Sequence, residues 1–149
     1  MNETSRFAPD ANDSIRELRW KAESMLEYLR DQEALLRQFP VGAIDERLQL
    51  WQGLAQLLAR AMENPELAFD ARIEAYRVWG EETHHTAMFI VTMSVYTRSE
   101  AAQARFAEDP EVLDLLIERF ERSRPAALKV LSTADLKHLR EEGFLRAGE

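Results

Sequence analysis

Four residues near the middle of the chain have side chains suited to metal or acid–base chemistry: Glu81, Glu82, His84 and His85, within the segment EETHHTAMFIVTMSVY. On a helix, residues three or four positions apart share a face. Glu81 can therefore pair with His84 or His85, and Glu82 with His85. A carboxylate beside an imidazole can bind a metal ion, transfer a proton or respond to pH. These four residues are the candidate metal ligands.

A structural role is the main alternative for this cluster. Adjacent helical residues diverge by about 100°, so His84 and His85 are poorly placed to share one ion. The E-x-x-H spacing resembles half of the motif in ferritin-like di-iron bundles, which need it on two helices with two further glutamates. The only other histidine is His138, and it does not complete such a motif. Acidic residues at a helix start and hydrogen-bonded histidines would explain the cluster without a metal.

An enzyme is less expected than a binding protein. Acid–base catalysis by Glu81 or Glu82 needs the histidines to line a pocket, and no set of nucleophile, base and oxyanion donors converges in the sequence. The five glycines have no phosphate-cradling spacing, which argues against P-loop and dinucleotide sites. The absence of cysteine removes thiolate chemistry and most structural zinc sites. We predict no cofactor.

Charge and hydropathy restrict the partners and the location. The formal net charge of −8 argues against binding nucleic acid or an anionic membrane surface. The longest uncharged run, residues 83–97, is shorter than the roughly 18–20 residues that span a bilayer. The polar first residues lack the apolar core of a signal peptide. We expect an acidic, soluble, cytoplasmic protein with no transmembrane segment.

Apolar spacing predicts an all-α fold, a compact bundle of about five to seven helices. Residues 1–12 read as a flexible N-terminal arm and residues 13–149 as a single all-α domain. Ser14, with Glu17 three positions on, predicts the first helix start. The break at residues 39–42, FPVG, is short, so the helices before and after it should form an antiparallel hairpin.

The segment from Glu81 to Tyr96 is apolar on every side and is predicted to be the central, buried helix. Its β-branched residues also fit a strand, but no other segment offers a strand to pair with, so helix is preferred. Gly80 could be a hinge, a helix end or a point of close packing. The spacing Ile73, Tyr76, Gly80 continues across it, which indicates that the helix can run through.

Further helix boundaries are predicted toward the end of the chain. Asp109-Pro110 should start a helix and Arg124-Pro125 should end it. Ser132 should open the last helix and Gly143 close it. Residues 125–146 can be read as a helix-turn-helix, but the acidic residues among the basic ones argue against DNA contact.

By elimination, the sequence predicts a non-enzymatic regulatory, adaptor or inhibitor-type protein. It would bind another protein of unknown identity through a helical face and could also form a homodimer. Trp20 points away from the apolar seam of the first helix, so either the arm carrying Phe7 or a partner should cover it. Trp20, Tyr28 and Phe7 are the candidate interaction residues. The alternative function is a small-ligand or metal-binding bundle that uses residues 81–85.

A second alternative comes from a resemblance. The segment LWQGLAQLLARAMENPELAFDARIEAYRVW, residues 50–79, resembles phasins and the N-terminal region of polyhydroxyalkanoate synthases, which also alternate amphipathic helices with Trp and an Asn-Pro break. The likeness covers about a fifth of the chain. It implies a coat on an apolar granule surface, although an apolar helix stripe more often belongs to a protein core.

Overall fold

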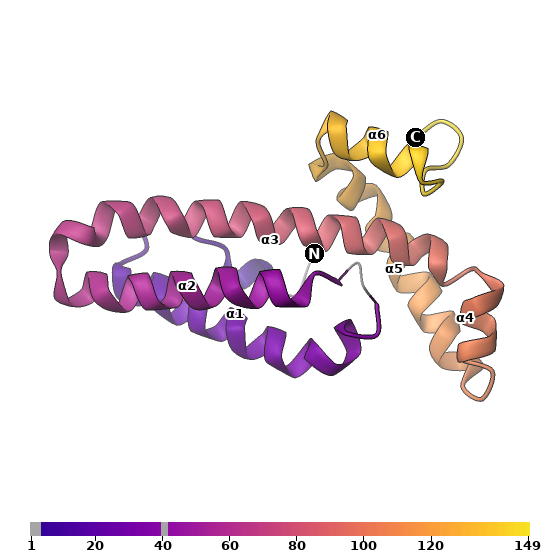
Figure 1. Cartoon of the computed structure of the whole chain (residues 1–149), viewed down its shortest axis with the longest axis horizontal. Helices are drawn as coiled ribbons and strands as arrows, with labels where there is room; N and C mark the ends of the chain where they lie inside the picture. The colour runs from indigo at the N-terminus through magenta and orange to yellow at the C-terminus, as the bar shows by residue number, and fades with distance from the viewer. Residues whose placement is uncertain (1–3, 40–41) are drawn as a thin grey trace. The chain divides into compact units, whose positions relative to one another are not determined.

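The computed structural model describes residues 4–39 and 42–149 and confirms the all-α prediction (Figure 1). Within these ranges there are six α-helices and no strand. The helices are α1 (Ile15–Leu36), α2 (Ile44–Glu63), α3 (Ala68–Tyr96), α4 (Glu100–Arg105), α5 (Pro110–Val130) and α6 (Thr133–Glu141). Short 3-10 turns occur at Ser5–Phe7 (η1) and Pro65–Leu67 (η3). Parts of the predicted arm and of the predicted break, residues 1–3 and 40–41, lie outside the described ranges.

The chain forms two compact units, Met1–Glu82 and Thr83–Glu149, and the boundary between them falls inside α3. We call them unit 1 and unit 2. Each has its own buried residues and its own polar contacts. The prediction of a single all-α domain over residues 13–149 stays a prediction.

Unit 1 contains the predicted antiparallel hairpin of α1 and α2, together with the first part of α3 (Figure 1). The α1 start is where the sequence places it, because the Ser14 hydroxyl accepts a 3.1 Å hydrogen bond from the Glu17 N–H. The unit buries apolar side chains from all three helices: Leu18, Ala22, Met25, Leu26, Leu29, Trp51, Leu54, Leu58, Ala61, Ala71, Ala75 and Val78.

Helix α3 runs through Gly80 without a break, and the preference for helix over strand at residues 86–97 is confirmed. Its hydroxyl side chains are satisfied locally. Ser94 Oγ donates to the Val91 carbonyl at 2.7 Å, and Thr97 Oγ1 donates to the Met93 carbonyl at 2.8 Å. These bonds within the helix allow polar residues to sit in a buried segment.

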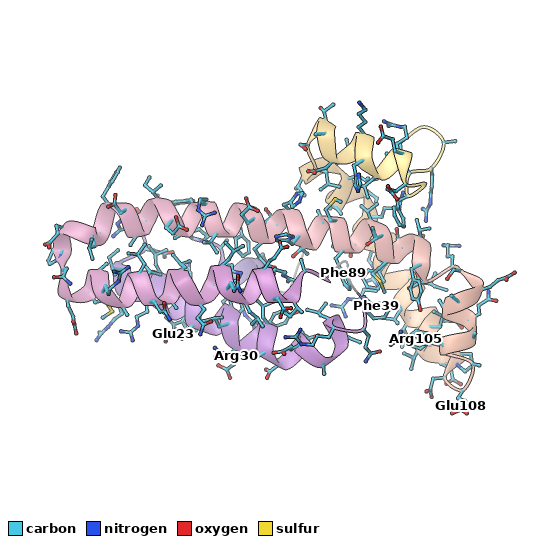
Figure 2. The ribbon with its side chains drawn as sticks, in the orientation of Figure 1. Glu23, Arg30, Phe39, Phe89, Arg105 and Glu108 are labelled. Atoms are coloured by element: carbon cyan, nitrogen blue, oxygen red, sulfur yellow. The ribbon has the colours of Figure 1, made fainter. Side chains whose placement is uncertain are left out.

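Unit 2 is built on a small apolar cluster from α3, α5, α6 and the residue after α5: Ala87, Val91, Ala127, Leu131 and Leu139. Phe89, labelled in Figure 2, adds an edge-on ring contact with Phe120 at 5.8 Å between centroids. Only some residues of the predicted buried helix are fully inside, since Phe89 and Ile90 are half-buried. The helix that was predicted to be buried is therefore buried on only part of its surface.

The predicted helix end at Arg124-Pro125 is wrong, because α5 continues through Pro125 to Val130. A proline inside a helix loses one backbone hydrogen bond and costs about 3 kcal/mol. Burial of Ala127 and Leu131 in the cluster offsets that loss. The start of α6 follows the sequence, with Ser132 and Asp135 forming a capping box. At its end, Gly143 has φ 84° and the Phe144 N–H donates to the Leu139 carbonyl at 2.8 Å.

Candidate functional site

Glu82, a candidate metal ligand, lies in a buried ion pair of unit 1. The Arg47 guanidinium donates from Nε to Glu82 Oε1 at 3.0 Å and from Nη2 to Oε2 at 2.6 Å. Trp51 Nε1 also donates to Oε1, at 3.0 Å. The Arg47 and Glu82 side chains are only 6% and 2% exposed. This carboxylate therefore connects α2 to α3 in the interior and is not accessible to a ligand.

The remaining groups of the Arg47 network are satisfied within unit 1. Arg47 Nη1 donates to the Gly42 carbonyl at 3.1 Å, and the Trp51 ring meets Trp79 edge-on at 6.2 Å between centroids. Across the described residues no buried side-chain nitrogen or oxygen lacks a hydrogen-bond partner. A buried bidentate pair in which each guanidinium nitrogen has a hydrogen-bond partner is a structural clamp.

The other three members of the predicted metal cluster are not brought together around one point. In unit 2, His84 Nδ1 lies 3.2 Å from Asp135 Oδ2, and the Asp135 carboxylate also accepts from Ser132 at the start of α6. The His84 and His85 rings meet edge-on at 5.4 Å, and Glu81 is exposed. Residues 4–39 and 42–149 contain no group of three or more His, Asp or Glu side chains that could hold a metal ion.

Unit 2 has a second buried guanidinium, Arg124, which the sequence did not single out. Its side chain is 2% exposed. Nη1 donates to Ser94 Oγ at 2.6 Å, and Nη2 donates to the Phe144 carbonyl at 2.7 Å and to Glu149 Oε1 at 2.6 Å. Arg124 thus joins α3, α5 and the segment after α6. Like Arg47, it is fully used by the fold.

Two carboxylates of unit 2 are held ionised by neighbouring arginines. Hydrogen bonds from Arg146, reinforced by Arg98, lower the pKa of Glu121 from 4.5 to about 2. The Arg124 guanidinium lowers the pKa of Glu149 in the same way, also to about 2. Both shifts arise from ion pairing that favours the charged form. These groups stabilise the fold and carry no acid–base role near neutral pH.

The predicted interaction residues Phe7 and Trp20 contact each other. Phe7 is buried, and its ring meets Trp20 edge-on at 6.1 Å between centroids. Lys21 Nζ donates to the Ala8 carbonyl at 2.8 Å and to Asp13 at 2.7 Å, which attaches the segment after η1 to α1. Trp20 nevertheless stays 60% exposed. The third candidate, Tyr28, is half-buried.

The largest aligned set of exposed apolar side chains lies on α3. Phe69, Ile73 and Tyr76 are 72%, 56% and 48% exposed. Their spacing of four and three residues places them on one side of the helix. We call these three residues the outer stripe. All of them belong to unit 1.

The opposite side of the same helix segment is buried in unit 1. Ala71, Ala75 and Val78 are 0%, 3% and 0% exposed. At 100° per residue, their mean direction lies about 160° from that of the outer stripe. The first part of α3 therefore has two apolar faces, a small-residue face that the unit buries and a large-residue face that it leaves exposed.

Other exposed apolar residues do not line successive turns of one helix face as the outer stripe does; in α5, Val112 and Leu115 are near the start and Val130 is at the far end. Across the described chain, the remaining large apolar side chains with high exposure are dispersed over α1, α2 and α5: Trp20, Leu35, Met62, Val112, Leu115 and Val130. Single exposed apolar side chains are ordinary on protein surfaces. The outer stripe is the feature that calls for a functional explanation.

Comparisons with protein-family models, with curated proteins and with solved structures give no match to this chain. No helix in the described part of the chain is long and apolar enough to cross a membrane.

Proposed function

We propose that this chain is a non-enzymatic, adaptor-type helical protein that binds another protein through the outer face of α3. The observation that carries the proposal is the outer stripe. Three large apolar side chains, 72%, 56% and 48% exposed, are aligned on one helix face. A helix that presents apolar residues at i, i+4 and i+7 matches the anchors used in helix-mediated protein recognition.

The size of the stripe supports a protein partner. Aromatic side chains bury about 150–250 Å² each when fully covered, so the exposed parts of Phe69, Ile73 and Tyr76 amount to roughly 300 Å². That area is comparable to the largest apolar patch on a typical monomer, which is often functional. Two of the three residues are aromatic, and aromatic residues are enriched at the centres of protein interfaces.

The polar clusters of the chain support a binding role over catalysis. The buried charged side chains Glu82, Arg47 and Arg124 are occupied by one another or by neighbouring groups. An active site needs at least one such group free to meet a substrate. The outer face of α3, by contrast, is directly accessible.

The proposal is tested by affinity capture from native lysate with three tagged forms of the chain: wild type, Ile73→Lys and Leu35→Lys. Leu35 is the matched control, because it is an exposed apolar residue on another helix of unit 1, 51% exposed against 56% for Ile73. Lysine is a good helix former, so both variants should keep their helical circular dichroism. A charge at the centre of an apolar contact should remove binding.

We expect a protein captured by wild type and by Leu35→Lys, and lost with Ile73→Lys. Equal capture by all three forms would place the binding surface elsewhere and refute the proposal. Loss with Leu35→Lys as well as with Ile73→Lys, with helicity intact, would also count against a site restricted to α3.

A further inference from the structure

We infer that the outer stripe binds a second copy of this chain, with the two α3 helices packed antiparallel. This inference rests on the proposed function and names its partner. Three observations within unit 1 support it: the spacing of the outer stripe, the position of Gly80 and the charges beside the stripe. In a two-fold symmetric interface the same surface of both copies must fit itself. The apolar residues, Gly80 and the charges on this face of α3 match one another in that way.

The spacing of the stripe continues to Gly80. Phe69, Ile73, Tyr76 and Gly80 follow intervals of four, three and four, the pattern of a helix that packs along a neighbouring helix. In an antiparallel pair centred between Ile73 and Tyr76, Ile73 of one copy faces Tyr76 of the other. Phe69 of one copy then faces Gly80 of the other, and the two-fold axis repeats both contacts.

Packing within a single copy does not explain why position 80 is a glycine. It lies in the interior of α3, where glycine lowers helix stability relative to alanine. A Cβ at this position would meet nothing within 4 Å, so the fold of a single chain would accept a larger residue than glycine there. In the antiparallel pair, the absence of a side chain at Gly80 leaves room for the large ring of Phe69.

Charges beside the stripe favour the antiparallel direction. Asp70 is exposed, and Arg77, one heptad later, is 53% exposed and forms an ion pair with Glu74 of its own helix. Both flank the stripe on the same side, so an antiparallel pair brings Asp70 of each copy next to Arg77 of the other. A parallel pair would instead bring Arg77 next to Arg72 of the other copy, and like charges disfavour it.

The area of the contact sets the expected strength. The stripe contributes roughly 300 Å² from each copy, which gives a total near 600 Å². Stable dimers usually bury more than about 1,200 Å², and smaller contacts are weak and transient. The pair should therefore form in a concentration-dependent manner in the micromolar range or above.

The test is sedimentation equilibrium of the full chain from low to high micromolar concentration, with four variants: Asp70→Arg, Arg77→Asp, the double charge swap Asp70→Arg/Arg77→Asp, and Gly80→Leu. Each single charge reversal places two like-charge contacts in the symmetric pair. We therefore expect the dissociation constant of the dimer to rise about tenfold. The double swap restores opposite charges and should return the dissociation constant to within about threefold of wild type.

Gly80→Leu tests the packing independently of charge. Leucine favours a helix over glycine, so the chain should keep or increase its helicity. The added side chain occupies the space that Phe69 of the other copy needs, and the dimer should be lost. Glu74→Gln is the control for Arg77→Asp, because it removes the internal partner of Arg77 without altering the contact between copies.

Wild-type chain that stays monomeric at the highest concentration would overturn the inference. So would a dimer that forms equally well in Gly80→Leu, or a double swap no better than its single variants. The proposed function is judged separately: if the chain is monomeric but Ile73→Lys still abolishes capture of another protein, the binding surface stands and its partner is a different chain.

Discussion

Replacing Arg47 by methionine is expected to destabilise unit 1 severely. The Glu82 side chain is only 2% exposed. The substitution removes both guanidinium hydrogen bonds to its carboxylate, at 3.0 and 2.6 Å, and leaves the buried charge without its cationic partner. Removing one partner of a buried ion pair costs about 3–5 kcal/mol, because the other charge stays buried without compensation. Whole domains are stable by only about 5–15 kcal/mol, so this loss is a large share of the total.

The double variant Arg47→Met/Glu82→Leu gives the sharper measurement. Replacing a buried pair with apolar residues of similar size is often close to neutral. Here the Trp51 N–H loses an acceptor and the Gly42 carbonyl loses a donor, which together cost on the order of 2 kcal/mol. The double variant should therefore be more stable than Arg47→Met alone, although it carries one more substitution.

Tryptophan fluorescence during urea unfolding is the suitable assay. All three tryptophans, Trp20, Trp51 and Trp79, lie in unit 1, so the signal follows that unit alone. Arg19→Met is the control, since Arg19 forms an exposed pair with Glu23 and should change stability by less than about 1 kcal/mol. A cost below about 1 kcal/mol for Arg47→Met, or a double variant as unstable as the sum of its single variants, would contradict a stabilising role for the buried Arg47–Glu82 pair.

Three further predictions concern the pH response, a helix cap and Gly80. Because the pKa of Glu121 is about 2 in the folded chain and 4.5 ordinarily, its stabilisation is complete above pH 4.5 and is lost as the pH falls toward 2. Glu121→Gln should weaken that acid sensitivity, measured by the amide NMR signals of residues 83–149; an unchanged acid transition would contradict it. Ser132→Ala removes the cap of α6 and should cost about 1 kcal/mol, seen as faster amide hydrogen exchange in α6 but not in α1. Gly80→Ala should raise the urea stability of unit 1 by about 0.5–1 kcal/mol at concentrations where the chain is monomeric, and a loss would show that Gly80 is needed within its own copy.

Local signals predicted the helix boundaries well. The Ser14 cap, the Ser132 capping box and the Gly143 helix end depend on residues within a few positions of each other, and the structure contains all three. Pro125 does not end its helix as local sequence signals predict, because the outcome depends on whether the residues after it are buried. The apolar residues after it, Ala127 and Leu131, belong to the core of unit 2, so helix α5 continues.

The role of Glu82 depends on a contact that no local pattern shows. Its position three residues before His85 suggested a shared ligand, whereas its partner Arg47 is 35 residues away in the sequence. Only the packing of α2 beside α3 within unit 1 brings the two together. A charged residue on an otherwise apolar helix face, flanked by Ala75 and Val78, was the signal that could have indicated a buried ion pair.

The exposure of the outer stripe could not be predicted from the sequence for a different reason. Hydrophobicity favours burial of large side chains such as Phe69, Ile73 and Tyr76. The structure buries Ala71, Ala75 and Val78 instead. Small side chains allow helices to approach closely. When a helix has apolar residues on two opposite faces and the chain covers only one of them, the sequence does not show which face is buried.

The most direct test of the binding surface is photo-crosslinking in cells with p-benzoylphenylalanine in place of Tyr76. This residue keeps an aromatic ring on the outer face of α3 and reacts only with what touches it. The same residue at Leu35 is the control, because that position is comparably exposed, 51% against 48%. A covalent protein adduct from position 76 and none from position 35 is the predicted result, with the mass of two chains if the partner is a second copy. No adduct at position 76, or equal adducts at both positions, would contradict a binding role for the outer face of α3.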